Sequence, residues 1–241
     1  MAGRTNWSFF PCHVTVSIRA EVKSVWRVQA MALQSHARPT EHNMTTHCIL
    51  SPNDYRRMPW KNGGGHTMQI ATHPADASLA SFVWRVSVAE VTQDGPFSPF
   101  TGIDRTLVLL TGAGMKLAGD SEPMELRTPF EPLSFSGDEA LHCSLMGGPV
   151  RDFNLMVRRG AALGNVVIRR EGGEPIPPAD TYVCYAALGA SECLVPGHPP
   201  ISLAEDHALL VTPESGAGVH GLSVNPLAAG SVALIAAIRL Q

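Results

Sequence analysis

Phe82 to Val91 reads FVWRVSVAEV, and this stretch decides the fold class. Its side chains alternate between two faces, with one face formed by Phe82, Trp84, Val86 and Val88 and the other by Val83, Arg85, Ser87 and Ala89. Alternation with a period of two predicts a β-strand that carries a core on its apolar face.

Similar short apolar runs continue on both sides of this stretch. They are separated by turn-forming residues, because 19 prolines and 22 glycines are spread along the 241 residues. Thr106–Leu110 and Met115–Leu117 flank Gly112-Ala113-Gly114, which predicts strand, turn, strand. Helical periodicity is hard to find. Short strands at this spacing predict an all-β fold, either a sandwich or a barrel.

An internal repeat indicates two halves. Three runs recur at an offset of roughly 75 to 80 residues: 107–112, 133–135 and 154–158 correspond to 185–189, 209–211 and 234–238. We therefore predict two small β-barrel halves, residues 46–150 and 151–241. The second half is rich in alanine and poor in charge, so the first half should carry the functional site.

Residues 1–45 differ from the rest of the chain. Basic residues outnumber acidic ones, and no apolar core of a secretory signal is evident. We predict a disordered or non-native N-terminal extension, with Met31 or Met44 as the natural start. An organelle transit peptide is the alternative.

Composition restricts the partners. A net charge of -3 and a pI near 6.3 disfavour nucleic acid and anionic membranes. No apolar run approaches the ~20 residues that span a bilayer. Five cysteines without CxxC spacing indicate reduced thiols and a cytoplasmic protein. We leave a homodimer open.

Chemistry-bearing residues gather at Trp60-Lys61-Asn62-Gly63-Gly64-Gly65. A cation, an amide and an aromatic ring beside three glycines could form a binding wall, since glycine lets a ligand approach the backbone. A hairpin or loop tip is the structural alternative.

Three cations, Lys61, Arg85 and Arg105, occur in apolar or glycine-rich surroundings, where unpaired burial is costly. Either they pair internally, with Glu90, Asp104 or Asp152, or at least one faces a bound carboxylate. A guanidinium offers two parallel donors for that purpose.

Alternation also places Asp152, Asn154 and Met156 on one face of a strand. We interpret this polar face as a cavity lining, and the alternative is a solvated outer surface. Trp60 and Phe100 would then be flat apolar walls, although each could equally be core.

Five motifs in order resemble the HutD/Ves family, and the resemblance covers residues 46–241: Trp60 to Thr67, Trp84 to Val91, Gly95 to Thr106, Phe135 to Asp138 and Gly148 to Met156. It implies a bicupin-like fold, a histidine-utilisation context and a regulatory role in binding a small molecule. Ligands of that pathway, such as urocanate and N-formylglutamate, are carboxylates. The N-terminal extension departs from the family pattern.

Metal and cofactor sites are not predicted. Metal cupins place two histidines one residue apart on a strand, and this sequence has no His-x-His among its ten histidines. Phosphate-loop and nucleophile-elbow motifs are also missing. A metal-independent hydrolase or isomerase, in which Asp104 and His66 act as acid and base, is the alternative function. A scaffold with a vestigial cavity is a third.

We therefore predict a protein that binds a small anionic metabolite, and the family resemblance implies a regulatory role in histidine catabolism. The predicted ligand-binding residues are Trp60, Lys61, Asn62, Gly63, Gly64, Gly65, Arg85, Ser87, Phe100, Asp104, Arg105, Asp152, Asn154 and Met156.

Overall fold

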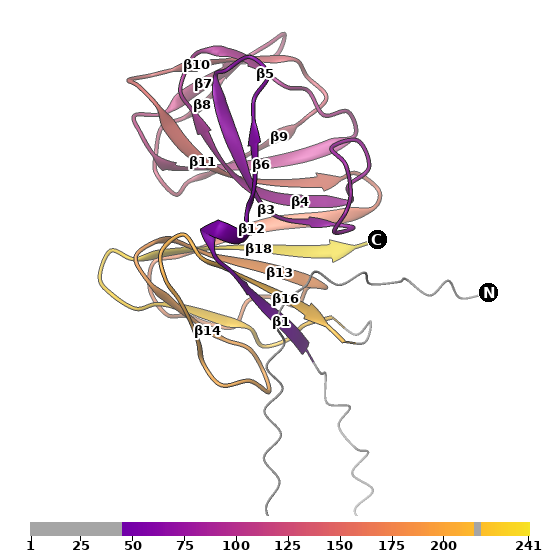
Figure 1. Cartoon of the computed structure of the whole chain (residues 1–241), viewed down its shortest axis with the longest axis vertical. Helices are drawn as coiled ribbons and strands as arrows, with labels where there is room; N and C mark the ends of the chain where they lie inside the picture. The colour runs from indigo at the N-terminus through magenta and orange to yellow at the C-terminus, as the bar shows by residue number, and fades with distance from the viewer. Residues whose placement is uncertain (1–44, 215–217) are drawn as a thin grey trace, which may run out of the picture.

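The computed structural model describes residues 45–214 and 218–241, and it consists almost entirely of antiparallel β-strands (Figure 1). The one helical element among these residues is the short 3-10 helix η1 (Pro52–Asp54). The extension predicted for residues 1–45 lies outside the described residues, Thr45 excepted. No helix in the described segments is long and apolar enough to cross a bilayer.

The strands of the described residues form four sheets, and the two halves are defined by these sheets, so that the strand Val150–Arg158 counts with the first half and the strand Thr45–Leu50 with the second. Two sheets make up the first half. The larger has six strands in the order β2 (Arg56–Pro59), β3 (Gly65–His73), β4 (Trp84–Val91), β11 (Val150–Arg158), β6 (Ile103–Thr111) and β9 (Pro132–Ser136). The smaller has four, in the order β5 (Gly95–Phe97), β10 (Leu141–Leu145), β7 (Met115–Ala118) and β8 (Met124–Leu126).

Two further sheets make up the second half. Five strands are ordered β1 (Thr45–Leu50), β16 (Ala208–Pro213), β13 (Thr181–Leu188), β18 (Val232–Leu240) and β12 (Ala162–Arg169). Three are ordered β15 (Ile201–Leu203), β14 (Ser191–Leu194) and β17 (Ser223–Pro226).

Hydrophobic cores lie between successive sheets, so the molecule is layered along its long axis (Figure 1). One core joins the four-stranded and six-stranded sheets and contains Leu107 and Leu117. The central core joins the six-stranded and five-stranded sheets through Phe153 and Tyr185. The third lies within the second half. Burial of this apolar surface is the main force that holds the layers together.

The alternation that predicted a strand is confirmed for β4, but Phe82 lies before this strand and packs with Met156 instead of with the central core. Trp84, Val86 and Val88 belong to the central core. Their neighbours Arg85 and Ser87 point to the opposite side, into the space below the four-stranded sheet, and are also buried. Both faces of β4 are therefore covered, and its polar residues lie inside the protein.

The predicted repeat agrees with the strand order. In the larger sheets, the order β4-β11-β6-β9 of the first half matches β12-β18-β13-β16 of the second. In the smaller sheets, β10-β7-β8 matches β17-β14-β15. Strand pairing leaves every sheet open at two edges, so two closed barrels are not confirmed and the bicupin arrangement stays a prediction.

The predicted division at residue 150 also stays a prediction. Two strands pair across it: β1 pairs with β16 in the five-stranded sheet. Likewise β11 pairs with β4 and β6 in the six-stranded sheet.

The strand-turn-strand prediction around Gly112 and Gly114 is confirmed as β6, turn, β7. Both glycines have positive φ, 103° and 108°. A Cβ on Gly114 would lie 2.4 Å from the carbonyl oxygen of Leu126, so only glycine fits. The two strands belong to different sheets, however, because the turn carries the chain from the larger sheet to the smaller.

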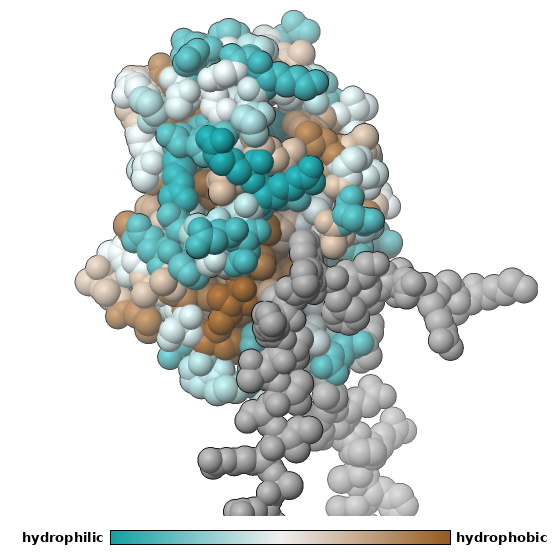
Figure 2. All heavy atoms as spheres, in the orientation of Figure 1, coloured by the Kyte–Doolittle hydropathy of each residue, from teal (hydrophilic) through white to brown (hydrophobic). Residues whose placement is uncertain are grey.

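The surfaces of the two halves differ. Figure 2 shows hydrophilic residues over most of the upper half of one face and more hydrophobic ones over the lower half. Apart from Leu79, the exposed large hydrophobic residues of the described segments belong to the second half and β1: Ile49, Leu163, Leu188, Leu194, Leu227 and Leu240.

Three cysteines, Cys143, Cys184 and Cys193, are buried free thiols. Cys48 is disulfide-bonded, so the prediction of reduced thiols is wrong for this residue.

Candidate ligand-binding site

The loop between β2 and β3 has a fixed shape. Gly63 has a φ of 72° and donates its N–H to the carbonyl of Trp60, and the N–H of Gly64 donates to Asn62 Oδ1 at 3.1 Å. A Cβ on Gly65 would lie 2.1 Å from the carbonyl oxygen of Glu90. The glycines thus shape the loop, and the side chains of Lys61 and Asn62 line the cavity beside it.

Strand register arranges the cavity side chains in three levels along β11. Met156 lies between Arg85 of β4 and Arg105 of β6. Asn154 lies between Ser87 and Leu107, and Asp152 lies between Ala89 and Leu109. Residues opposite one another in an antiparallel sheet point to the same side, so all three levels face the space under the four-stranded sheet.

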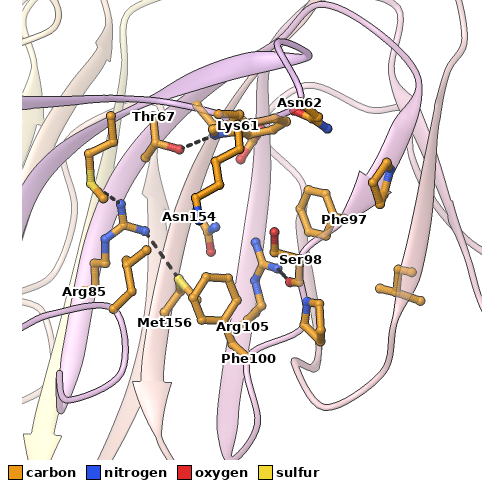
Figure 3. A pocket seen from close by; sticks show the side chains of 18 of the residues that line it. Lys61, Asn62, Thr67, Arg85, Phe97, Ser98, Phe100, Arg105, Asn154 and Met156 are labelled. Carbon is orange, nitrogen blue, oxygen red and sulfur yellow. Dashed lines mark hydrogen bonds between the residues drawn. The ribbon is translucent and has the colours of Figure 1, made fainter.

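This space contains a cavity of about 660 Å³. Its walls include Trp60 and Phe97, and Figure 3 shows Lys61 extending from the loop towards Asn154. Trp60 is fixed by a hydrogen bond from its Nε1 to Thr67 Oγ1 at 2.9 Å. A volume of this order suits a small metabolite.

Arg105 is buried among aromatic rings. Its guanidinium carbon lies 4.3 Å from the ring centre of Phe97, 5.5 Å from that of Phe100 and 5.3 Å from that of Phe135. Its hydrogen bond to the Ser98 carbonyl is long, at 3.5 Å, and its Nε has no partner in the described segments. Burial lowers the pKa of Arg105 to about 10, so it stays charged at neutral pH.

Arg85 is buried, and no acidic side chain of residues 45–214 or 218–241 forms an ion pair with it. Its Nε donates to Gln69 Oε1 at 2.8 Å, while Nη1 and Nη2 contact the sulfur atoms of Met156 and Met58 at 3.7 and 3.5 Å (Figure 3). Thioether sulfur is a weak acceptor, so two donor groups are poorly satisfied. Burial, and to a lesser extent Arg56, lower the pKa of Arg85 to about 10.

Asp152 is the acid of the cavity. It is 1% exposed, and neither carboxylate oxygen has a hydrogen-bond partner within residues 45–214 and 218–241. Burial raises its pKa to about 7, although the charge of Arg105 acts in the opposite direction. The two residues form no ion pair, since no guanidinium nitrogen of Arg105 lies within 4.0 Å of a carboxylate oxygen of Asp152.

The structure brings together most of the predicted site. The predicted residues that line the cavity are Trp60, Lys61, Asn62, Arg85, Phe100, Arg105, Asp152, Asn154 and Met156. Ser87 is fully buried beside Asn154. Gly63, Gly64 and Gly65 shape the adjoining loop instead of lining the cavity.

Asp104 lies elsewhere. It is exposed and accepts a hydrogen bond from Arg159 Nε at 2.9 Å, so it does not meet His66 as the acid of an acid–base pair. The reason is strand alternation: Asp104 and Arg105 are neighbours on β6, and only one of them can face the cavity.

Sequence reasoning missed several lining residues, among them Phe97, Met58 and Leu141. Phe97 belongs to a motif that was recognised, Gly95 to Thr106, but nothing in its spacing separates it from an ordinary core residue. Met58 directly precedes the recognised loop.

The described segments contain no set of side chains that could ligate a metal ion. No group of three or more His, Cys, Asp or Glu side chains there could hold an ion.

Comparison with known proteins adds the family. The HutD family model matches residues 52–229. The chain belongs to the HutD family. An uncharacterised 21.2 kDa protein in the hutC 3' region of Pseudomonas putida is 44% identical over 108 residues, which are 45% of this chain and 56% of that protein. Protein Ves of Citrobacter koseri is 34% identical over 110 residues, 44% of this chain and 56% of that protein.

The chain thus spans about half the length of these curated relatives. The solved structure of HutD from Pseudomonas fluorescens SBW25 covers more: it is 31% identical, with a TM-score of 0.67 over 81% of this chain and 100% of that one. Solved structures of 10% identity or less share only the fold, which is cupin-like. The match to the HutD family links the chain with a histidine-utilisation locus.

Proposed function

We propose that this HutD-family protein binds a small anionic metabolite, a carboxylate, in the cavity of its first half. The observation that carries the proposal is the charge of the lining. Lys61, Arg85 and Arg105 contribute three positive charges, and none of the ion pairs found in the described segments involves them.

Physical chemistry favours an anion as their partner. In the described segments the two buried guanidinium groups form no ion pair, and they carry a desolvation cost that a bound carboxylate would offset. The guanidinium carbon of Arg105 lies over the ring of Phe97, 4.3 Å from its centre, and this contact restricts the side chain before the ligand arrives. Such preorganisation lowers the entropy lost on binding.

The family context supports the class of ligand and the role. Urocanate and N-formylglutamate are carboxylates of histidine utilisation, and both are small enough for a cavity of about 660 Å³. We propose a regulatory role, in which occupancy of the cavity reports the level of the metabolite in the cytoplasm. The protein needs no metal or cofactor for this role.

A titration of matched ligands tests the proposal. Urocanate and its carboxamide have the same size and shape but differ in charge. Isothermal titration should give at least a roughly ten-fold higher affinity for the carboxylate, the order expected for a charge-assisted pair. Equal affinities, or no binding of any histidine-pathway carboxylate, would exclude the proposal.

One observation favours a second function, a metal-independent hydrolase or isomerase. Asp152 has a pKa of about 7 and lines the cavity, as a general acid or base must. Incubation of histidine-pathway intermediates with the purified protein, followed by product analysis, separates the two. Turnover that disappears in Asp152→Asn would support the enzyme, and unchanged substrate would support binding alone.

A further inference from the structure

Buried polar atoms without partners concentrate at one place in the described part of the chain. Most of them belong to four neighbouring residues of the first half: Ser87 Oγ, Arg105 Nε, both carboxylate oxygens of Asp152, and Asn154 Oδ1. A native protein leaves few such atoms unsatisfied, because each costs free energy comparable to a lost hydrogen bond. Three of these residues, Arg105, Asp152 and Asn154, line the cavity, so a ligand there would supply the missing partners.

Donors and acceptors are separated along this wall. The level of Met156 carries the guanidinium groups of Arg85 and Arg105, which can only donate. One and two levels further along β11, the unpartnered atoms of Asn154 and Asp152 are acceptor oxygens. Successive side chains on one face of a strand are about 6.6 to 6.8 Å apart, so the backbone of Asn154 lies one such step from the level of Met156 and that of Asp152 two steps, about 13 Å. The arginine side chains are long, and a small metabolite can bridge from their donors to these acceptors.

The surroundings of Asp152 leave its acceptors for the ligand. Its register neighbours are Ala89 and Leu109, which offer no side-chain donor. A neutral N–H that points at a carboxylate makes a hydrogen bond of above-average strength in a buried site.

We infer that the ligand of this cavity carries an N–H donor at the end opposite its carboxylate, and that Asp152 accepts this hydrogen bond. The inference rests on the proposed function and deepens it, because it defines the ligand as a carboxylate with a distal imidazole or amide N–H. Asp152 is then a specificity-determining residue, which distinguishes nitrogenous carboxylates from other organic acids of the same size.

Two pairs of probes test the role of the N–H. Urocanate is compared with 3-(3-furyl)acrylate, which keeps the planar ring and the carboxylate but has no N–H. 4-Formamidobutyrate, which has a single carboxylate and a distal amide N–H, is compared with its N-methyl derivative. Each pair is titrated against the wild type, against Asp152→Asn, which keeps the side-chain shape, and against Asp152→Leu, which removes every acceptor. Asp120→Asn, an exposed acid, serves as the control.

In the wild type, at least one of the two N–H ligands should bind about ten-fold more tightly, or better, than the matched analogue that lacks the N–H. In Asp152→Leu the preference should fall to about two-fold or less, and Asp120→Asn should keep it. The test compares the affinity ratio of the two ligands in the wild type with the same ratio in Asp152→Leu. The steric effect of the N-methyl group contributes to both ratios and therefore cancels in the comparison. A preference that survives in Asp152→Leu would overturn the inference.

Proton release gives a second readout. Asp152 has a pKa of about 7, so roughly half of the free molecules carry its proton at pH 7. An N–H donor stabilises the carboxylate and should release that proton on binding. The ionisable groups that face Asp152 titrate well away from pH 7: Arg105 and Arg85 have pKa values lowered to about 10, and burial raises the pKa of Cys143 to about 12. Lys61 also carries charge at the cavity.

Calorimetry in two buffers of different ionisation enthalpy measures the protons released. The wild type should release about 0.5 proton more than Asp152→Asn at pH 7. Proton uptake would mean that protonated Asp152 donates to the ligand, and would contradict the inference. If carboxylates bind without dependence on Asp152, only this inference fails. If no carboxylate binds, the proposed function fails with it.

Discussion

Arg151 Nη2 donates to Asp206 Oδ1 at 2.7 Å, and this ion pair joins the two halves of the molecule. Arg151 belongs to β11 of the six-stranded sheet, whereas Asp206 precedes β16 of the five-stranded sheet. The carboxylate of Asp206 also accepts from the hydroxyl of Tyr185, and its backbone carbonyl accepts from the hydroxyl of Tyr55 at 2.6 Å. One residue therefore connects three others across the central layer.

Replacing Asp206 by alanine should destabilise the fold by about 2 to 4 kcal/mol. It removes the carboxylate that accepts from Arg151 and Tyr185, and it puts alanine at a φ of 65°. Asp206→Asn should cost only about 1 kcal/mol, because asparagine accepts hydrogen bonds and tolerates this backbone conformation. Urea denaturation of both variants measures the loss of unfolding free energy. Equal losses for Asp206→Ala and Asp206→Asn would contradict the role of the Asp206 side chain as a hydrogen-bond acceptor.

The loop beside the cavity should be sensitive to one glycine and tolerant at the next. Gly65→Ala places a Cβ 2.1 Å from a backbone oxygen of Glu90 and should cost about 1 to 3 kcal/mol of stability. Gly64→Ala meets nothing closer than Asn62 Oδ1 at 3.4 Å and should change stability by less than about 0.5 kcal/mol. Carboxylate affinity, measured on folded protein, should fall for Gly65→Ala only, because Lys61 and Asn62 are displaced.

The free protein should lose stability as the pH rises towards and through 7. The pKa of Asp152 is raised to about 7 in the folded state, above its unfolded value of about 3.9. The folded protein therefore binds the proton more tightly than the unfolded chain does. The stabilisation that this gives is fully present below about pH 4, and it is lost as the pH rises to and through about 7. Asp152→Asn should therefore be more stable than the wild type at pH 8, by about 1 to 4 kcal/mol, and similar to it at pH 4. Denaturation at both pH values measures this, and a difference that does not depend on pH would contradict a buried, unpaired carboxylate.

Treatment with a chelator should leave the protein unchanged. We expect EDTA to shift the melting temperature by less than about 1 °C, since metal that binds only the folded state would stabilise it. Elemental analysis of the purified protein supplies the independent check. Close to one transition metal per chain would show that the protein has a metal site.

Local patterns predicted much of the fold. Alternation at Phe82–Val91 identified β4 and the face that carries Arg85, because a strand repeats every two residues whatever surrounds it. The same rule put Asp152 and Asn154 on one face of β11. Which strands share a sheet is not predictable in this way: the strand-turn-strand pattern at Gly112 and Gly114 does not show that β6 and β7 belong to different sheets.

Partners of individual side chains were also beyond local patterns. Sequence proximity suggested that Arg85 and Arg105 could pair with nearby acids. Instead Arg85 contacts Gln69, Met58 and Met156, and Arg105 lies against aromatic rings. These contacts depend on how the two sheets of the first half face each other, and a single sequence does not encode that arrangement in any short window. The sequence indicated the candidate site through the residues around Trp60 and the cations in apolar surroundings, and the geometry then gave each residue its neighbours.

The affinity of Arg105→Ala for a carboxylate tests the central claim most directly. The substitution should weaken binding of urocanate or N-formylglutamate by roughly ten- to hundred-fold, because it removes a charge-assisted pair worth about 1.5 to 3 kcal/mol. Arg105→Lys should restore only part of the loss, since an ammonium group cannot present two parallel donors. Arg127→Ala, which removes an exposed arginine paired with Glu125, is the matched control. A folded Arg105→Ala protein with a lowered melting temperature but unchanged affinity would show that Arg105 only supports the fold, and would contradict the account.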